Sequence, residues 1–366
     1  MDNLTHSLLG AALAKTRLGG ASPFAPAALV VAANLPDFEN LVLAFCDKPT
    51  NMIHHRSVTH AVVGVVILAP LLALFVRGLE RRFRRGLPSG RFWTLLLGIG
   101  LATASHPVLD WLNTYGVRPW LPFDGTWYHG DLVHIVDPWL WLLFGGAVCL
   151  AGRRTATGSI TLGILGVLTT VVVLLADSMM PRVLPVIWSI ALLVLVSGRW
   201  GNLGRRHAGA TVVTAFALAA GYVGLRGWAG HRAWQMSQPV LAAQLGPGEA
   251  IIAHTQSPDP ADPLRWQIIA ETRAAVYRHG FSITEAPGGL VRLPKRLDDP
   301  LVQKAADSPE GRAWRTFARH PVAVITREGT GRRVYLLDAR DPMCPAHGFA
   351  CVILDAPPPP PAGRAD

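Results

Sequence analysis

The chain has 366 residues, of which 50% are hydrophobic and 16% are charged, and its mean hydropathy is +0.31. Soluble domains carry about 25% charged residues, so this composition favours a membrane protein over a soluble globular enzyme. Much of the formal net charge of +10 comes from arginine clusters between apolar runs, a pattern typical of membrane orientation signals. No basic module with interleaved aromatic residues accompanies the charge, so we expect no nucleic-acid partner.

The N-terminal region, residues 5–45, contains two apolar stretches separated by charged residues, glycines and prolines. Each stretch is shorter than the ~20 residues that a membrane-spanning helix needs. We therefore predict a re-entrant or interfacial helical hairpin, and an ordinary buried helix pair is the alternative.

Apolar runs of spanning or near-spanning length follow this region. They lie at 61–79, 92–112, 138–151, 159–177, 183–197 and 210–227. Arginines gather in alternate connecting loops, at 77–91, 152–158 and 198–209. The positive-inside rule places these loops in the cytoplasm and the loops between them outside. The sequence thus predicts a mainly α, polytopic membrane helical bundle over residues 1–230, with its histidine-rich segments on the outer face.

After residue 230, short runs of alternating apolar and polar residues predict a small β-rich soluble domain over 231–356, on the outer side by the same count. A Gly-Thr-Gly at 329–331 is a hairpin signal between two of these runs. The Pro-rich segment 357–366 predicts a flexible tail. Cys344 and Cys351 can pair in an oxidising compartment, a question that the sequence leaves open.

Imidazole and carboxylate side chains recur at the edges of the apolar spans. Such groups cost desolvation free energy at a membrane surface, whereas histidine nitrogen and carboxylate oxygen are ligands of zinc. Their repeated pairing therefore predicts a divalent metal site. His106 and Asp110 are spaced i, i+4, so on a helix they share a face. Because Pro107 suits a first helical turn, we expect His106 near a helix N-terminus.

The segment 54–60 reads His-His-Arg-Ser-Val-Thr-His. His55 and His60 are a near-helical pair of candidate ligands, and His54 is an alternative ligand. Arg56 is free on this interpretation to meet an anionic group such as phosphate. Interfacial polar residues that flank a membrane helix are the plainer interpretation of any single histidine.

Three more ionisable residues precede the run at 138–151. Asp137-Pro138 is typical of a helix start with proline at the first position, which makes Asp137 a cap. Asp131 and His134 could complete a second metal site or hold metal-binding imidazoles through hydrogen bonds. The sequence does not decide between these roles.

Five strings together resemble the YdjM-type family of inner-membrane metal-dependent hydrolases, which in some bacteria is tied to the LexA-controlled SOS response. They are Met-Asp-Asn-Leu-Thr-His6, Asn-Leu-Pro-Asp37, the segment 54–60, Ser-His106-Pro-Val-Leu-Asp110 and Ile-Val-Asp137-Pro. Their order is also similar to zinc-dependent phospholipase C and P1-type nucleases. The resemblance implies the metal ligands His6, Asp37, His60 or His55, His106 and Asp110. An N-terminal tryptophan amine and a clear His-x-x-x-Glu are missing, so we expect one or two metal ions rather than three.

The function predicted from these features is metal-dependent hydrolysis of a phosphoester, with zinc as the expected metal. Such a metal lowers the pKa of water toward neutrality. Asp37 is the candidate general base or bridging ligand, and Arg56 the candidate for stabilising phosphate charge. A site at headgroup level favours a membrane lipid or lipid-linked substrate, with a small-molecule phosphoester as the other option. The alternative is a non-enzymatic membrane protein with a structural metal and a partner-binding outer domain. A transporter is less favoured because the polar residues lie at one face. The sequence does not indicate an oligomeric state.

Overall fold

The computed structural model describes residues 1–83, 91–176, 181–284, 288–328, 331–341 and 351–356. The chain folds into two compact units, which we call the helical unit and the C-terminal unit. The helical unit consists of Met1–Glu39, Arg56–Gly230 and Pro258–Leu264. The C-terminal unit consists of Asn40–His55, His231–Ser257 and Arg265–Asp366. Two short segments, 40–55 and 258–264, therefore belong to a different unit from the chain on either side. The predicted tail at 357–366 lies outside the described residues.

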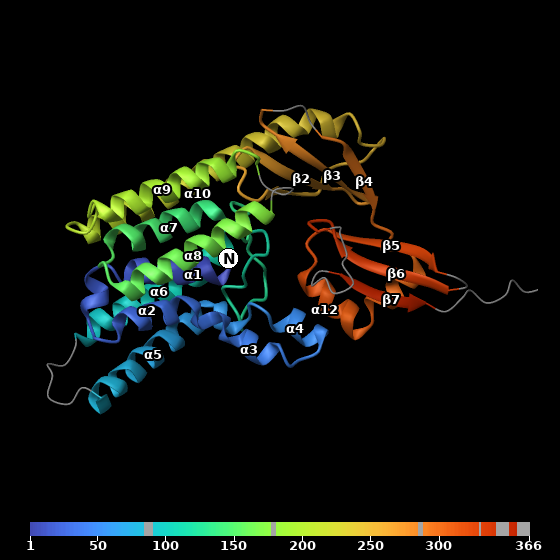
Figure 1. Cartoon of the computed structure of the whole chain (residues 1–366). Coiled ribbons are helices and arrows are strands. Elements are labelled where there is room, and N and C mark those ends of the chain that lie inside the picture. The colour runs from blue at the N-terminus through green and yellow to red at the C-terminus, as the bar shows by residue number, and fades with distance from the viewer. Residues whose placement is uncertain (84–90, 177–180, 285–287, 329–330, 342–350, 357–366) are drawn as a thin grey trace, which may run out of the picture. The chain divides into compact units, whose positions relative to one another are not determined.

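The helical unit is built from long apolar helices that run side by side (Figure 1). They are α1 (Asn3–Leu13), α2 (Ala25–Asn34), α5 (Val62–Phe83), α6 (Phe92–Trp111), α7 (Pro138–Ala151), α8 (Ala156–Leu175), α9 (Leu184–Trp200) and α10 (Ala208–Ala242), whose last turns belong to the C-terminal unit. Short 3-10 turns are η1 (Arg17–Gly20), η2 (Leu35–Phe38) and η3 (Val58–His60). Each of the six apolar runs predicted between residues 61 and 227 is one helix.

Four of these helices, α5, α6, α8 and α10, are long and apolar enough to cross a membrane. A helix of 20 residues is about 30 Å long, which equals the thickness of the hydrocarbon core of a bilayer. The helices α7 and α9 are apolar but shorter. The helical unit is therefore a bundle of membrane-spanning type. That α1 and α2 form a re-entrant hairpin stays a prediction.

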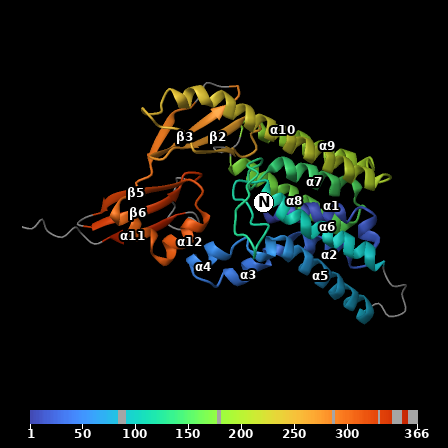
Figure 2. The ribbon, with the colours of Figure 1, turned by 180° about the vertical axis from the view of Figure 1, so that it is seen from behind.

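The two N-terminal helices pack closely on each other and on α6, as Figures 1 and 2 show. A Cβ atom at Gly10 of α1 would lie 2.6 Å from the Leu29 carbonyl oxygen of α2, so only glycine permits this approach. Leu29 and Ile99 are fully buried in the core between α2 and α6, where many of the other residues are alanines. Small residues let membrane helices come close. This packing brings η2, which follows α2, to the C-terminal half of α6.

The C-terminal unit contains two antiparallel sheets. The strands are β1 (Ala253–Pro258), β2 (Arg265–Glu271), β3 (Ala275–Ser282), β4 (Leu290–Pro294), β5 (Pro321–Glu328), β6 (Gly331–Asp338) and β7 (Val352–Ala356). Their order is β1-β2-β3-β4 in one sheet and β5-β6-β7 in the other. Glu328 of β5 pairs with Gly331 of β6, as the hairpin signal predicts, although residues 329–330 themselves lie outside the described part. The helices α11 (Pro300–Ala306) and α12 (Pro309–Phe317) were not predicted.

The segment 40–55 belongs to the C-terminal unit, and it forms most of α3 (Glu39–Leu43) and all of α4 (Lys48–His54). Met52 is 1% exposed and packs in one apolar cluster with Trp314. The Lys48 ammonium donates a hydrogen bond of 2.5 Å to the Cys351 carbonyl oxygen. Cys351 is disulfide-bonded, whereas the predicted partner Cys344 lies outside the described residues.

Candidate metal centre

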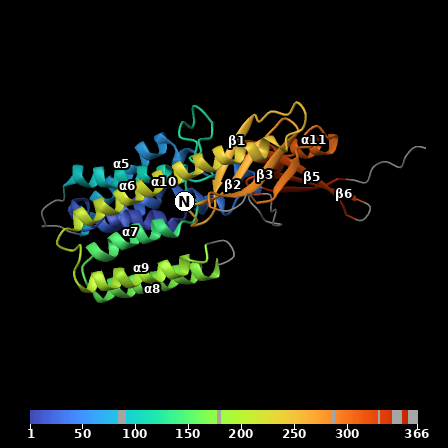
Figure 3. The same cartoon turned by 90° about the horizontal axis from the view of Figure 1, so that it is seen from above.

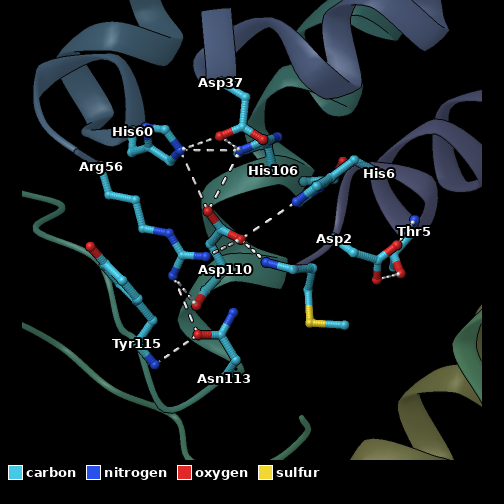
Figure 4. Close-up of polar contacts among 12 residues, drawn as sticks. Asp2, Thr5, His6, Asp37, Arg56, His60, His106, Asp110, Asn113 and Tyr115 are labelled. Atoms are coloured by element: carbon cyan, nitrogen blue, oxygen red, sulfur yellow. Dashed lines mark hydrogen bonds and ion pairs between the residues drawn. The ribbon is translucent and has the colours of Figure 1, made fainter. Parts of the chain in front are cut away.

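Five of the six predicted metal ligands meet in the helical unit (Figure 4). They are His6 of α1, Asp37 of η2, His60 of η3, and His106 and Asp110 of α6. Ligand atoms lie within 4.8 Å of one another in two overlapping groups, one with His6, Asp37 and His106, the other with His60, His106 and Asp110. The sixth, His55, is in neither group, and its Nδ1 lies 2.9 Å from Oδ1 of Asn40. The structure thus gathers His60 rather than His55 into the centre.

The imidazoles of His60 and His106 each lie close to one carboxylate oxygen of Asp37 and one of Asp110. Nε2 of His60 lies 3.2 Å from Nε2 of His106, 3.4 Å from Oδ1 of Asp37 and 3.5 Å from Oδ2 of Asp110. Nε2 of His106 lies 3.6 Å from each of the same two carboxylate oxygens. Zinc bonds of about 2.0–2.1 Å place tetrahedral ligand atoms roughly 3.4 Å apart. The five distances are near this value, so both imidazoles and one of the carboxylates can hold one ion.

The two central imidazoles are oriented through their other ring nitrogens. Nδ1 of His106 lies 2.7 Å from the Ala33 carbonyl oxygen, and Nδ1 of His60 lies 3.1 Å from the Thr59 hydroxyl. Metal-binding histidines usually make such hydrogen bonds, which fix the tautomer and point the free nitrogen at the metal. Both Nε2 atoms therefore face the centre.

His6 has an environment suited to a metal ligand. Its ring is fully buried and stacks on His106 with 3.8 Å between centroids, yet neither ring nitrogen has a hydrogen-bond partner. A buried polar atom without a partner is costly, and native structures contain few of them. His6 belongs to the ligand group with Asp37 and His106, so an ion bound by that group would satisfy one of its ring nitrogens.

The charge states suit a cation. Burial, and then the charge of His106, lower the pKa of His6 to about 3, so the imidazole is neutral. Burial alone would raise the pKa of Asp37, but its contacts with His106 and His60 lower it well below the usual range. Burial opposes protonation of His60, whereas Asp110 and Asp37 raise its pKa. A metal must displace this proton, so we expect metal affinity to fall in acid.

Glu39 is a functional residue that the sequence analysis missed. Its carboxylate accepts hydrogen bonds from the Arg56 amide at 2.5 Å and from the Thr59 hydroxyl, and it lies 3.4 Å from Nδ1 of His60. Arg56 has a φ of +52°, a left-handed conformation that costs a non-glycine residue about 1–2 kcal/mol. Glu39 offsets this strain and holds the turn that presents His60. In the sequence, its position two residues after the candidate ligand Asp37 was the feature that could have indicated this role.

The Arg56 side chain supports Asp110 from the other side. Its guanidinium lies 3.0 Å from Oδ1 of Asp110 and donates to the Gly116 carbonyl oxygen at 2.9 Å. Gly116 has a φ of +83°, which favours glycine, and the Tyr115 ring stacks 4.4 Å below the guanidinium. The Met1 amino group also donates to Oδ1 of Asp110. These contacts make Arg56 a positioning residue, and its predicted contact with phosphate stays a prediction.

One local prediction was wrong. His106 and Pro107 lie near the C-terminal end of α6 and not at a helix N-terminus, because the apolar span that begins at Phe92 continues through the proline. Proline removes one backbone donor, and membrane helices tolerate this where side chains or neighbouring helices satisfy the freed groups. The helix ends at Trp111, so His106 and Asp110 still share a buried face, as their spacing predicted.

The residues around 131–137 lie outside both ligand groups of the described chain. Asp137 caps α7 through the Trp139 amide at 3.0 Å, as predicted, and accepts a hydrogen bond of 2.8 Å from the Tyr222 hydroxyl. Nδ1 of His134 lies 3.3 Å from both backbone polar atoms of Val136. These contacts indicate structural roles for Asp137 and His134.

Apolar helices of spanning length, with a buried group of histidines and aspartates between them, define a membrane protein with a potential metal centre. Residues 1–180, just under half of the chain, match the YdjM inner membrane protein family. Over 162 residues the chain is 26% identical to "Uncharacterized protein YfhP" of Bacillus subtilis (strain 168), a match that covers 41% of this chain and 46% of that protein. The chain thus spans about half the length of this curated relative. No solved structure matches the chain.

We expect Glu39→Gln to weaken metal binding about 10- to 100-fold, the range found when a partner of a metal ligand is removed. The glutamine side chain has the same size as glutamate but lacks its negative charge. It is therefore a weaker hydrogen-bond acceptor for the Arg56 backbone N–H and the Thr59 hydroxyl. Competition with a chelator measures the affinity. Glu80→Gln is the matched control, because Glu80 is a buried carboxylate of α5 that pairs with Arg77 at 2.8 Å. Equal affinities in both variants would show that Glu39 does not position the centre.

Proposed function

We propose that the protein is a membrane-bound metal-dependent hydrolase that acts on a phosphoester. The main support is the size of the two overlapping ligand groups, each of which supplies three imidazole or carboxylate donors. A structural zinc site uses four ligands, whereas catalytic sites keep a position for water. Asp37 is also the donor with the most exposed side chain, at 12%, against 0–2% for the others. It is therefore the ligand that a substrate would meet.

The residues of this chain would divide the work as follows. His60, His106, Asp37 and Asp110 hold the ion, His6 adds a fifth donor, and Glu39 and Arg56 fix the turn and the carboxylate that carry them. A bound divalent metal, for which zinc suits the donors, supplies a Lewis acid and lowers the pKa of water. Asp37 is placed to accept a proton as the ester is cleaved.

The location of the centre favours a lipid or lipid-linked substrate. His60 lies two residues before the start of α5, and Asp110 lies in the last turn of α6. Both residues therefore lie at ends of candidate membrane helices. Ends of spanning helices lie near the headgroups. We propose the periplasmic face, because arginines gather in the loop at 77–91, beyond the other end of α5. Reporter fusions at residues 85 and 120 should give cytoplasmic and periplasmic signals, respectively, and the opposite pattern would refute this orientation.

A structural metal site is the second candidate, and one observation favours it. The two groups together contain five protein donors, enough to occupy all four positions of a closed structural site. Detergent-purified protein with full metal occupancy, assayed against phosphodiesters, phosphomonoesters and phospholipids, separates the two. We expect hydrolysis of at least one class that stops on chelation and returns with metal. A metal-replete protein that cleaves none of them would leave the structural role.

A further inference from the structure

The helical unit also contains an apolar cavity of about 530 Å³. None of the candidate metal ligands lines it. It lies among α1, α7, α8 and α9, and Figure 3 shows the α8–α9 pair running alongside α7. Ligand cavities in proteins measure about 300–1,000 Å³ and are mostly apolar with a few polar groups. The size and lining fit a bound molecule. An apolar cavity offers water few partners.

The cavity is elongated along the helices. Trp188 and Trp200, both on α9, line it at positions 12 residues apart, which corresponds to about 18 Å along a helix. One leaflet of a bilayer contributes about 15 Å of hydrocarbon, half of the core. The cavity is thus as long as one acyl chain of one leaflet.

One end of the cavity carries an unusual concentration of positive charge. Arg199 lines it and donates to the carbonyl oxygens of Cys149 at 2.7 Å and of Arg153 at 3.0 Å, while Arg154 donates to the Arg199 carbonyl oxygen at 2.7 Å. Lys15 lies beside them, and burial and then the Arg199 charge lower the pKa of its ammonium. We call Lys15, Arg153, Arg154 and Arg199 the basic cluster.

The part of the chain that the structure describes supplies the basic cluster with no acidic partner. Within the described residues, none of its four side chains forms an ion pair with a carboxylate. Arg153 and Arg154 are exposed, and Lys15 is half-buried. Positive charges next to an apolar cavity between membrane helices are the complement of a phospholipid with an anionic headgroup.

We propose that this cavity binds one acyl chain of an anionic membrane phospholipid, whose phosphate lies at the basic cluster. The chain would pack between α7 and the α8–α9 pair and against Leu4 and Leu8 of α1. His6 lies two residues from each of these leucines, on the opposite side of α1. The lipid site and the metal centre thus use opposite faces of one helix, and this site does not depend on the proposed hydrolysis.

Glycines of α8 allow the cavity to be filled without disturbing a neighbour. Gly163 and Gly166 line it, and a Cβ atom at either meets nothing within 4 Å. We expect the Gly163→Leu/Gly166→Leu variant to insert and fold but to exclude the acyl chain. The matched control is Gly221→Leu/Gly224→Leu, because those glycines of α10 also have open space and do not line the cavity.

Native mass spectrometry of the full chain in detergent, titrated with phosphatidylglycerol or phosphatidylethanolamine of identical chains, tests the site. We expect the wild type to retain one phosphatidylglycerol, at least about tenfold more tightly than phosphatidylethanolamine. Lys15→Gln/Arg153→Gln should abolish this preference, and the filled variant should lose both lipids. Arg81→Gln/Arg82→Gln, at the end of α5, should behave as the wild type.

Three results would overturn the proposal. One is equal retention of the two lipids by the wild type, because the basic cluster would then select no headgroup. Another is unchanged retention in the filled variant, because the lipid would then lie elsewhere on the apolar surface. The last is full competition by glycerophosphoglycerol, which carries the phosphate without acyl chains, because the cavity would then play no part.

Discussion

Replacing His106 with alanine should cost the protein most of its bound metal. Nε2 of His106 belongs to both ligand groups, so the substitution removes one donor from each. Loss of a hydrogen-bond partner of a ligand weakens binding by about 10- to 100-fold, and loss of the ligand itself should exceed this. Elemental analysis after dialysis against buffered metal measures the effect.

His55→Ala is the control for this variant, since His55 lies in the same histidine-rich string but contacts Asn40 and not the centre. We expect it to keep its metal. Asp110→Ala is a poorer test, because it would leave the buried Arg56 charge without its partner, a change that costs about 3–5 kcal/mol. Full metal content in His106→Ala would mean that the ion is held elsewhere.

Asp37→Asn should abolish hydrolysis while leaving the fold in place. The amide matches the carboxylate in size but is a poor base, and loss of a general base reduces rates by about 10²- to 10⁴-fold. Phosphoester cleavage has to be measured at saturating metal, because Asp37 is also a candidate ligand. Thermal unfolding of the same preparation checks the fold.

The Glu39→Gln variant provides the comparison for Asp37→Asn. It should recover activity when metal is raised to saturation, because Glu39 only positions a ligand, whereas Asp37→Asn should not. Recovery of both variants at saturating metal would assign Asp37 to metal binding alone. Loss of metal from Asp37→Asn at every concentration would show that Asp37 is required as a ligand.

The membrane helices were predictable because their signal is long and local. Each apolar run between residues 61 and 227 became a helix, since a bilayer-spanning segment must satisfy its backbone internally. The i, i+4 spacing of His106 and Asp110 likewise predicted that they share a helix face. Pro107 led to a wrong prediction because proline is common in the first turn of a helix. The apolar span upstream instead determined where the helix begins.

The missed features depend on contacts that sequence periodicity does not encode. The choice of His60 over His55 depends on a turn with a left-handed Arg56, which Glu39 holds from another element. The segment 40–55 joins the C-terminal unit through Met52, a single apolar side chain among polar neighbours. The helices α11 and α12 did carry local signals, because Asp299-Pro300 and Ser308-Pro309 are capped starts.

The excursion of residues 40–55 has a thermodynamic consequence. Asp37 and His60 stand at its two ends in the helical unit, while the residues between them fold with the C-terminal unit. An ion bound by both side chains would close this stretch into a loop. Loop closure reduces the conformational entropy of the chain before the C-terminal unit folds. Linkage is reciprocal, so unfolding of the C-terminal unit would weaken metal binding by the same free energy by which the metal stabilises that unit. Metal depletion should therefore lower the melting temperature of sheets that contain none of its ligands.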